Sequence, residues 1–227
     1  MNILKAAILL IAVTFGGLNS AARADVFEGD DNRAYMGVRA SFDIAALTQA
    51  DAARKSFENY ELGTGGALGA ICNVPLWKNL YFEPGASLYY NTVGYKLATT
   101  DEFKGTNHMD CSAKRFGLRL PFMFGYRFDF APCSVSVFTG PMFDFCLSGR
   151  YDLSIYVNDD IAGPMQDGSF KHCEFCWRFG AGVAVKRFVF EVSGALGLRQ
   201  TYKDTTLHYR NNLVQFSVGY NFGKFGR

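Results

Sequence analysis

Eight successive segments of this chain alternate apolar residues with charged residues or glycine, and almost every charge falls on the same parity. Residues 116–128 show the pattern best, because their aromatic and leucine side chains share one parity while Arg119 and Arg127 share the other. A helix would scatter these arginines around its circumference, whereas an extended strand separates them completely from the aromatic residues. The alternation therefore predicts β-strands with one apolar face and one polar face.

The N-terminal residues have the pattern of a cleavable signal peptide. Lys5 supplies a positive charge, residues 6–13 are apolar, and residues 22–24 read Ala-Arg-Ala, which is an A-x-A cleavage site. We expect residues 1–24 to be removed during export and residues 25–227 to form a single domain, because neither a linker nor a change in composition marks a second one.

Cleavage would leave a chain without net charge. The segment 1–24 contains two of the 23 lysines and arginines and none of the 21 acids, so 21 charges of each sign remain. This balance argues against a nucleic-acid partner. No later apolar run approaches 18 residues, so a membrane location would require a closed sheet.

The connections between the predicted strands alternate in length. The strands are expected near residues 33–46, 59–75, 79–95, 112–130, 133–151, 174–185, 187–200 and 211–223. The second, fourth and sixth connections are tight, whereas the other four, residues 47–58, 96–111, 152–173 and 201–210, are long and polar. Outer-membrane barrels have short periplasmic turns and long extracellular loops. We therefore predict an all-β fold, an eight-stranded antiparallel up-and-down transmembrane β-barrel in the bacterial outer membrane.

The polar face of this barrel should point into the lumen. Placing an arginine toward the middle of the bilayer costs roughly 2–4 kcal/mol, so the charged parity is expected inside. The predicted lumen charges are Arg39, Asp43, Glu61, Glu83, Arg115, Arg119, Arg127, Asp144, Arg150, Glu174, Arg178, Glu191 and Arg199. Seven cations and six anions can pair as guanidinium and carboxylate groups, which predicts a plugged polar core.

A soluble barrel of the lipocalin type, with the apolar face inside, is the structural alternative. Lysines such as Lys78 and Lys186 fall in turns and loops, whereas arginine and glycine occupy the polar parity. A strand face in water would normally carry lysine, threonine and serine, so the pattern favours an enclosed polar space. Glycines such as Gly117 and Gly125 share that parity and are expected to make room in a narrow interior.

Several of these segments resemble a known family. The signal peptide, the eight-strand pattern, the segment LRLPFMFGYRF with Pro121 inside a strand, and the closing strand VQFSVGYNF are similar to the small outer-membrane barrels of the porin-family or PorT-like group common in Bacteroidetes. The resemblance covers nearly the whole mature chain. It implies an outer-membrane location, a monomeric barrel and no assigned activity.

Six cysteines are unusual for such a barrel. Export allows disulfides, and six thiols permit 15 pairings. Cys146 and Cys176 share the lumen parity on strands that flank the 152–173 connection, so a cross-strand disulfide between them is expected if the register aligns them. The alternative is that cysteines remain as small buried apolar residues.

The sequence shows no pattern for a metal, a cofactor or catalysis. His108, His172 and His208 fall in different loops, and their spacing matches no closed zinc motif. An acyl-transfer triad needs a positioned base, and no histidine lies within a predicted strand on the lipid face. We therefore expect no enzyme activity, no cofactor and no metal site.

Three functional hypotheses follow from the barrel pattern. The first is an envelope anchor or surface-interaction protein that uses four extracellular loops, with outer-membrane lipid around it and proteins or envelope components as partners. The second is a narrow porin-like pore, which eight strands disfavour because side chains fill so small a barrel. The third is a carrier of small apolar ligands, which would require a gap in the wall.

Overall fold

The computed structural model describes residues 34–49, 58–98, 108–130, 133–157, 160–164, 172–199 and 209–225. Their strands are β1 (Ala34–Gln49), β2 (Glu58–Glu61), β3 (Gly63–Trp77), β4 (Leu80–Ala98), β5 (His108–Phe130), β6 (Cys133–Val157), β7 (Asp160–Pro164), β8 (Cys173–Val185), β9 (Phe188–Gly197) and β10 (Tyr209–Phe225). The predicted signal peptide and much of the predicted loops lie outside the described residues.

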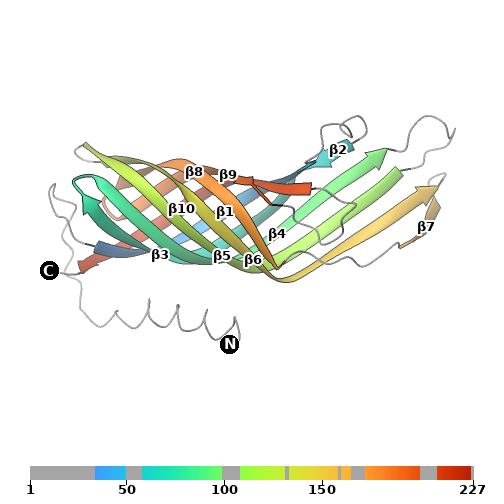
Figure 1. Cartoon of the computed structure of the whole chain (residues 1–227), viewed down its shortest axis with the longest axis horizontal. Helices are drawn as coiled ribbons and strands as arrows, with labels where there is room; N and C mark the ends of the chain where they lie inside the picture. The colour runs from blue at the N-terminus through green and yellow to red at the C-terminus, as the bar shows by residue number, and fades with distance from the viewer. Residues whose placement is uncertain are drawn as a thin grey trace.

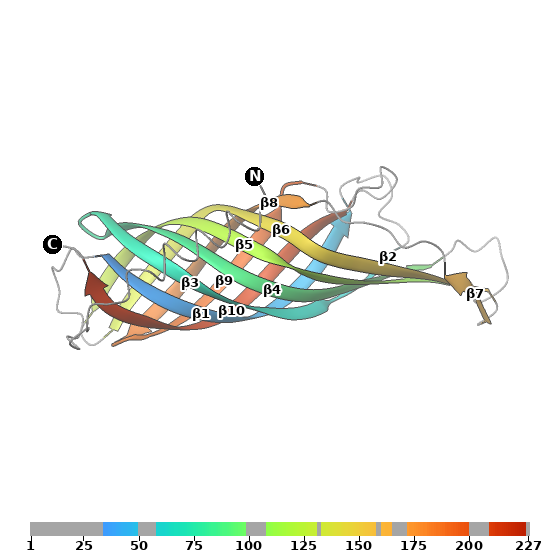
Figure 2. The same ribbon diagram turned by 90° about the horizontal axis from the view of Figure 1, so that it is seen from below.

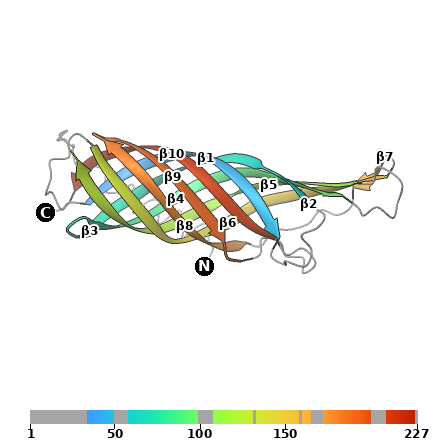
Figure 3. The same ribbon diagram turned by 90° about the horizontal axis from the view of Figure 1, so that it is seen from above.

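Eight of these strands form a closed antiparallel barrel (Figure 1). The order around it is β1, β3, β4, β5, β6, β8, β9 and β10, and β1 pairs with both β3 and β10. The strands run obliquely around the barrel (Figures 2 and 3). The short strands β2 and β7 pair only with β4 and β6, beyond the closed ring. Sequence reasoning thus predicted the fold class and the number of barrel strands correctly.

The two ends of the barrel differ. At the turn end, Lys78 and Asn79 join β3 to β4, and Lys186 and Arg187 join β8 to β9. Lys78 has φ of 49° and Lys186 has φ of 55°, the left-handed conformation that two-residue hairpin turns require at their first position. The opposite end, here called the loop end, lies where the predicted long connections leave the barrel.

The barrel is longer on one side. Strands β5 and β6 have 23 and 25 residues, whereas β8 and β9 have 13 and 10. The loop ends of β4, β5 and β6 therefore extend past the ring, together with β2 and β7, and form a projecting sheet (Figure 1). Part of this sheet lies in the predicted connections, because its residues are polar and lack the alternation of the membrane segments.

Prolines interrupt three neighbouring ladders. The β4–β5 ladder skips from Ser87↔Arg119 to Pro84↔Phe122, and similar skips occur between β3 and β4 and between β5 and β6. Pro84, Pro121 and Pro141 lie at these points and lack the N–H that a ladder uses. The wall continues past each interruption in the same register, so the barrel remains closed.

A β-bulge changes the predicted direction of one charged residue. Gly117 stands opposite Cys146, but Phe116 stands opposite Ser148, so Leu147 is an extra residue in β6. Such an insertion shifts the alternation by one position. Arg150, which parity alone assigned to the lumen, is therefore exposed on the outer face. That prediction was wrong because the pattern did not reveal the bulge.

In the described part of the chain, no helix has the length and apolarity needed to cross a membrane.

Candidate functional site: a charged lumen within an apolar wall

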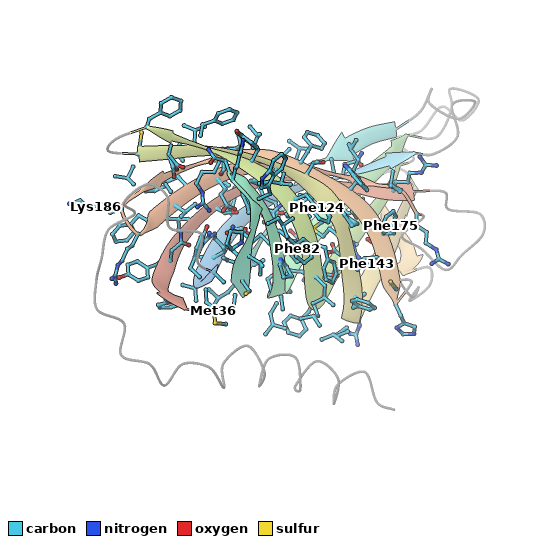
Figure 4. The ribbon with its side chains drawn as sticks, turned by 60° about the vertical axis from the view of Figure 1, so that its left-hand side comes forward. Met36, Phe82, Phe124, Phe143, Phe175 and Lys186 are labelled. Carbon is cyan, nitrogen blue, oxygen red and sulfur yellow. The ribbon has the colours of Figure 1, made fainter. Side chains whose placement is uncertain are left out.

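The outer wall is apolar on every strand of the barrel. Strand β9 shows the alternation clearly, because Phe188, Phe190 and Val192 are 54–55% exposed while Val189 and Ser193 are 3–5% exposed. On the neighbouring strands β4, β5, β6 and β8, the outer face carries Phe82, Phe122, Phe124, Phe143 and Phe175, several of them in ring contact (Figure 4). The soluble alternative, with this face inside, is excluded for the described strands.

The inner face buries ionised side chains among apolar ones such as Met123 and Met142. Arg115, Arg119, Asp43, Asp144 and Glu174 are each at most 2% exposed. Charges that are this deeply buried are stable only when they are paired and hydrogen-bonded. The lumen side chains form three clusters between the turn end and the loop end.

The central charge of the cluster nearest the loop end is Arg119. It donates from Nη1 to Asp43 Oδ2 at 2.9 Å and from Nε to Asp144 Oδ1 at 3.1 Å. Asp43 also accepts from Ser41 Oγ at 2.7 Å and from Gln215 Nε2 at 2.9 Å. One guanidinium thus joins carboxylates from β1 and β6 across the lumen.

Tyr89 and a second ion pair complete this cluster. The Arg119 guanidinium lies 4.7 Å from the Tyr89 ring centroid, and the Arg115 guanidinium lies 6.0 Å from the same ring, within the range of cation–π attraction. Arg115 Nη2 also donates to Glu174 Oε1 at 2.6 Å. A Cβ on Gly117 would meet this ring, so glycine is needed for the close approach.

The middle cluster is organised around Glu191. Arg39 Nε donates to Glu191 Oε1 at 3.0 Å, and Arg178 Nη2 lies 3.7 Å from Glu191 Oε2. Arg39 Nη1 donates to Asn221 Oδ1 at 2.9 Å, and Arg178 Nε donates to Ser193 Oγ at 3.0 Å. Side chains from β1 and β8 therefore meet at one carboxylate of β9, and Asn221 of β10 joins the cluster through Arg39.

The cluster nearest the turn end combines charges with tyrosines. Arg127 donates to the Tyr35 hydroxyl at 2.8 Å, and its guanidinium lies 5.4 Å from the Tyr81 ring centroid. Asn73 Nδ2 donates to Glu83 Oε2 at 2.9 Å. Gly125 leaves the space that the Tyr81 ring occupies. Glycine, tyrosine and charge therefore share this section of the lumen.

Little open space remains between these clusters. One cavity of about 40 Å³ lies between Arg39, Glu83, Arg119 and Gln215, and another of about 20 Å³ lies between Tyr35, Arg39 and Glu191. A water molecule needs at least roughly 10–15 Å³ of such volume, so each cavity holds only a few waters. From Arg115 toward the loop end, most buried inward side chains are apolar, including Ala45, Val93, Ala113, Ala195 and Leu213, and the polar Asn211 is buried there as well.

The structure brings most of the predicted lumen residues together, but not all. Arg199 follows the end of β9 and is exposed, so it joins none of the described clusters. Glu61 pairs with Gly94 through its backbone in β2, and its side chain lies outside the described part of the chain. Asn73, Gln215 and Asn221 also share the inward face, and the pattern of charges did not predict them because their side chains are neutral.

The predicted Cys146–Cys176 disulfide is absent, and both thiols are free. Cys176 stands opposite Met142, whereas Cys146 lies one residue beyond the Phe145↔Cys173 pair. The two cysteines are thus offset by four positions along neighbouring strands, which is too far for a bridge. The parity prediction was right, but the register does not align them.

Among the predicted loop histidines, His172 is exposed, whereas His108 is the first residue of β5 and pairs with Tyr156 of β6, because the strands continue past the predicted membrane segments. The His108 side chain and all of His208 lie outside the described structure. No group of three or more histidine, cysteine or acidic residues suited to a metal ion occurs among the described residues.

The closed ring defines the class of protein: a small eight-stranded antiparallel barrel of the outer-membrane type. No protein-family model and no curated protein matches the chain in sequence. Similar solved structures include Neisserial surface protein A, with 11% identity over 84% of this chain and 97% of that chain and a TM-score of 0.37. Ail, the attachment invasion locus protein of Yersinia pestis, has 10% identity over 84% of this chain and 99% of that chain, with a TM-score of 0.42. The outer membrane protein OprG from Pseudomonas aeruginosa has 10% identity over 86% of this chain and 98% of that chain, with a TM-score of 0.40.

Proposed function

We propose that this protein is a monomeric outer-membrane anchor that presents its projecting sheet and long connections to other molecules at the cell surface. The observation that supports this most is the reversed chemistry of the barrel, with aromatic and aliphatic side chains outside and buried ion pairs inside. Export would use residues 1–24 as a cleaved signal peptide. Membership of the PorT-like barrel group belongs to the same proposal.

The height of the apolar wall supports the membrane location. On β5 the outward residues are apolar from Phe116 to Phe128, and Lys114 follows at the loop end. Twelve residue steps at about 3.4 Å each and a tilt of about 40° span roughly 30 Å along the barrel axis, which is the thickness of a bilayer core. The wall therefore has the dimensions for bilayer insertion.

The filled lumen favours an anchor over a channel. The Arg119 cluster closes the cross-section, and the neighbouring cavities hold only a few waters. The projecting sheet is the part of the described structure that extends furthest past the barrel wall (Figure 2). We assign the contacts with other molecules to this sheet and to its connections.

Two measurements on the exported protein test this proposal. A detergent extract of the outer-membrane fraction is run on a denaturing gel with and without boiling, and we expect a fast compact band that slows after heating. Trypsin applied to intact cells should then cut the long connections and leave a protected barrel fragment. Recovery in the soluble fraction with one mobility, or full protection of the connections on intact cells, would contradict the proposal.

A narrow pore is the second candidate, because the two small cavities lie in line along the lumen between Arg119 and Tyr35. In planar bilayers, we expect the wild-type protein to show no steady conductance. A variant in which Asp43→Asn, Arg119→Ser and Asp144→Asn are combined removes the central ion pairs without leaving an unpaired charge. Conductance only in this variant would show that the cluster is the seal, whereas steady conductance of the wild type would favour the pore.

A further inference from the structure

Two basic side chains face each other on the outer surface near the loop end. Lys114 on β5 stands directly opposite Arg150 on β6, and both side chains are exposed. Like charges in directly opposed positions destabilise a sheet unless an anion lies between them. Among the described side chains, no acid forms an ion pair with either residue. The pair exists because the bulge at Leu147 turns Arg150 outward.

An apolar hollow lies below this pair on the same face. It has a volume of about 520 Å³, and its floor is formed by small residues such as Ala70, Cys72 and Ala86. Leu68 and Phe122 are among the larger residues that border it. The wall is indented here because short side chains on β3 and β4 alternate with long ones on the strands around them.

An aromatic step connects the hollow to the basic pair. Leu118 lines the hollow, and Lys114 lies four residues further along β5, a distance of about 13 Å along the strand. Tyr90 and Phe116 form the intervening cross-strand pair and are 50% and 41% exposed. The outer face thus presents an apolar hollow, then aromatic rings, then two cations, which is the order of tail, interface and headgroup in a lipid.

We propose that this face binds a membrane lipid with an anionic phosphate headgroup, whose phosphate lies between Lys114 and Arg150 and whose acyl chain fills the hollow. The guanidinium of Arg150 can hold phosphate oxygens in a bidentate manner, and the ammonium of Lys114 adds a point charge. A lipid suits the site because the hollow lies within the belt that faces the bilayer core. The inference rests on the proposed membrane location.

Native mass spectrometry of the exported protein, purified in detergent, tests the headgroup site. Phosphatidylglycerol and phosphatidylcholine with the same acyl chains serve as probes. We expect the wild type to retain phosphatidylglycerol preferentially and the double variant Lys114→Gln/Arg150→Gln to lose roughly 30-fold in affinity, since each basic residue near an anionic lipid contributes about one kcal/mol. The matched control, Lys78→Gln/Lys186→Gln at the turn end, removes the same charge and should retain the preference.

The hollow has its own test. Ala86→Phe fills it from the outer face and keeps both cations. This variant should lose affinity for long-chain phosphatidylglycerol but not for the dihexanoyl form, whose short chains do not reach the hollow. Equal retention of both headgroups by the wild type, or an equal loss in the turn-end control, would overturn the lipid site. Every variant is first checked for the heat-sensitive compact band, because its absence in the wild type would refute the membrane location instead.

Discussion

The lumen and the outer wall of this barrel are made by alternate residues of the same strands, yet their chemistry is opposite to that of a soluble protein. On β9, Phe190 is 55% exposed outside, while the next residue, Glu191, is 9% exposed and joins Arg39 inside. The stability of the inner face depends on complete pairing of specific charges. The stability of the outer face depends only on apolar character and depth in the bilayer. The two faces should therefore respond differently to mutation.

Breaking the central ion-pair cluster should have the largest effect. Arg119→Ala leaves Asp43 and Asp144 buried without their shared cation, and removing one partner of a buried pair costs about 3–5 kcal/mol. The free energy of unfolding is measured in lipid vesicles from the fraction of compact band against urea concentration. In the triple variant that adds Asp43→Asn and Asp144→Asn to Arg119→Met, much of the loss should be recovered. An Arg119→Ala variant as stable as the wild type would contradict the role of this cluster.

An arginine on the outer wall should have the next largest effect. Val192→Arg places a charge on an outward position of β9 and should cost roughly 2–4 kcal/mol if that position faces the bilayer core. Phe188→Arg, at the turn end of the same strand, is the depth control and should cost about 0–1 kcal/mol. The same urea titration measures both variants. Equal and negligible costs would indicate that the wall faces water.

Adding volume to the lumen should cost less. Gly125→Val would overlap the Tyr81 ring, and overpacking of this kind costs typically 1–3 kcal/mol. Tyr81→Val in the same chain should recover most of the lost stability, because it removes the ring that a valine at position 125 would overlap. Failure of this rescue would show that Gly125 is required for another reason.

The smallest effect is expected from the cysteines inside the lumen. Cys146 and Cys176 are free, so reducing agent should leave their contribution to the free energy of unfolding unchanged, whereas loss of a native disulfide would cost typically 2–5 kcal/mol. Peptide mapping without reduction shows directly whether the two cysteines are linked. A linked Cys146–Cys176 peptide would require a different register between β6 and β8.

The sequence predicts the faces of the barrel well, because one-residue alternation is a local property of each strand. It cannot predict the partners within the lumen, since Arg119 and Asp43 are 76 residues apart and meet only through the stagger of the closed ring. The register between β6 and β8 also keeps Cys146 and Cys176 apart. Both point inward as predicted, but their positions along the two strands differ by four residues. Arg150 changed face because a single bulged residue, Leu147, leaves no clear mark in the apolar pattern.

The most direct test of the reversed barrel is a nitroxide scan of β9 in lipid vesicles, with one spin label at a time from Phe188 to Leu196. A wall that faces lipid predicts that labels at Phe190, Val192 and Leu196 collide with dissolved oxygen but not with a water-soluble nickel complex. The label at Phe188, next to the turn, marks the interface and should also meet the nickel complex. Labels at Val189, Glu191, Ser193 and Ala195 should be shielded from both. Strong collision of the first group with the nickel complex, or no alternation along the strand, would contradict the membrane barrel.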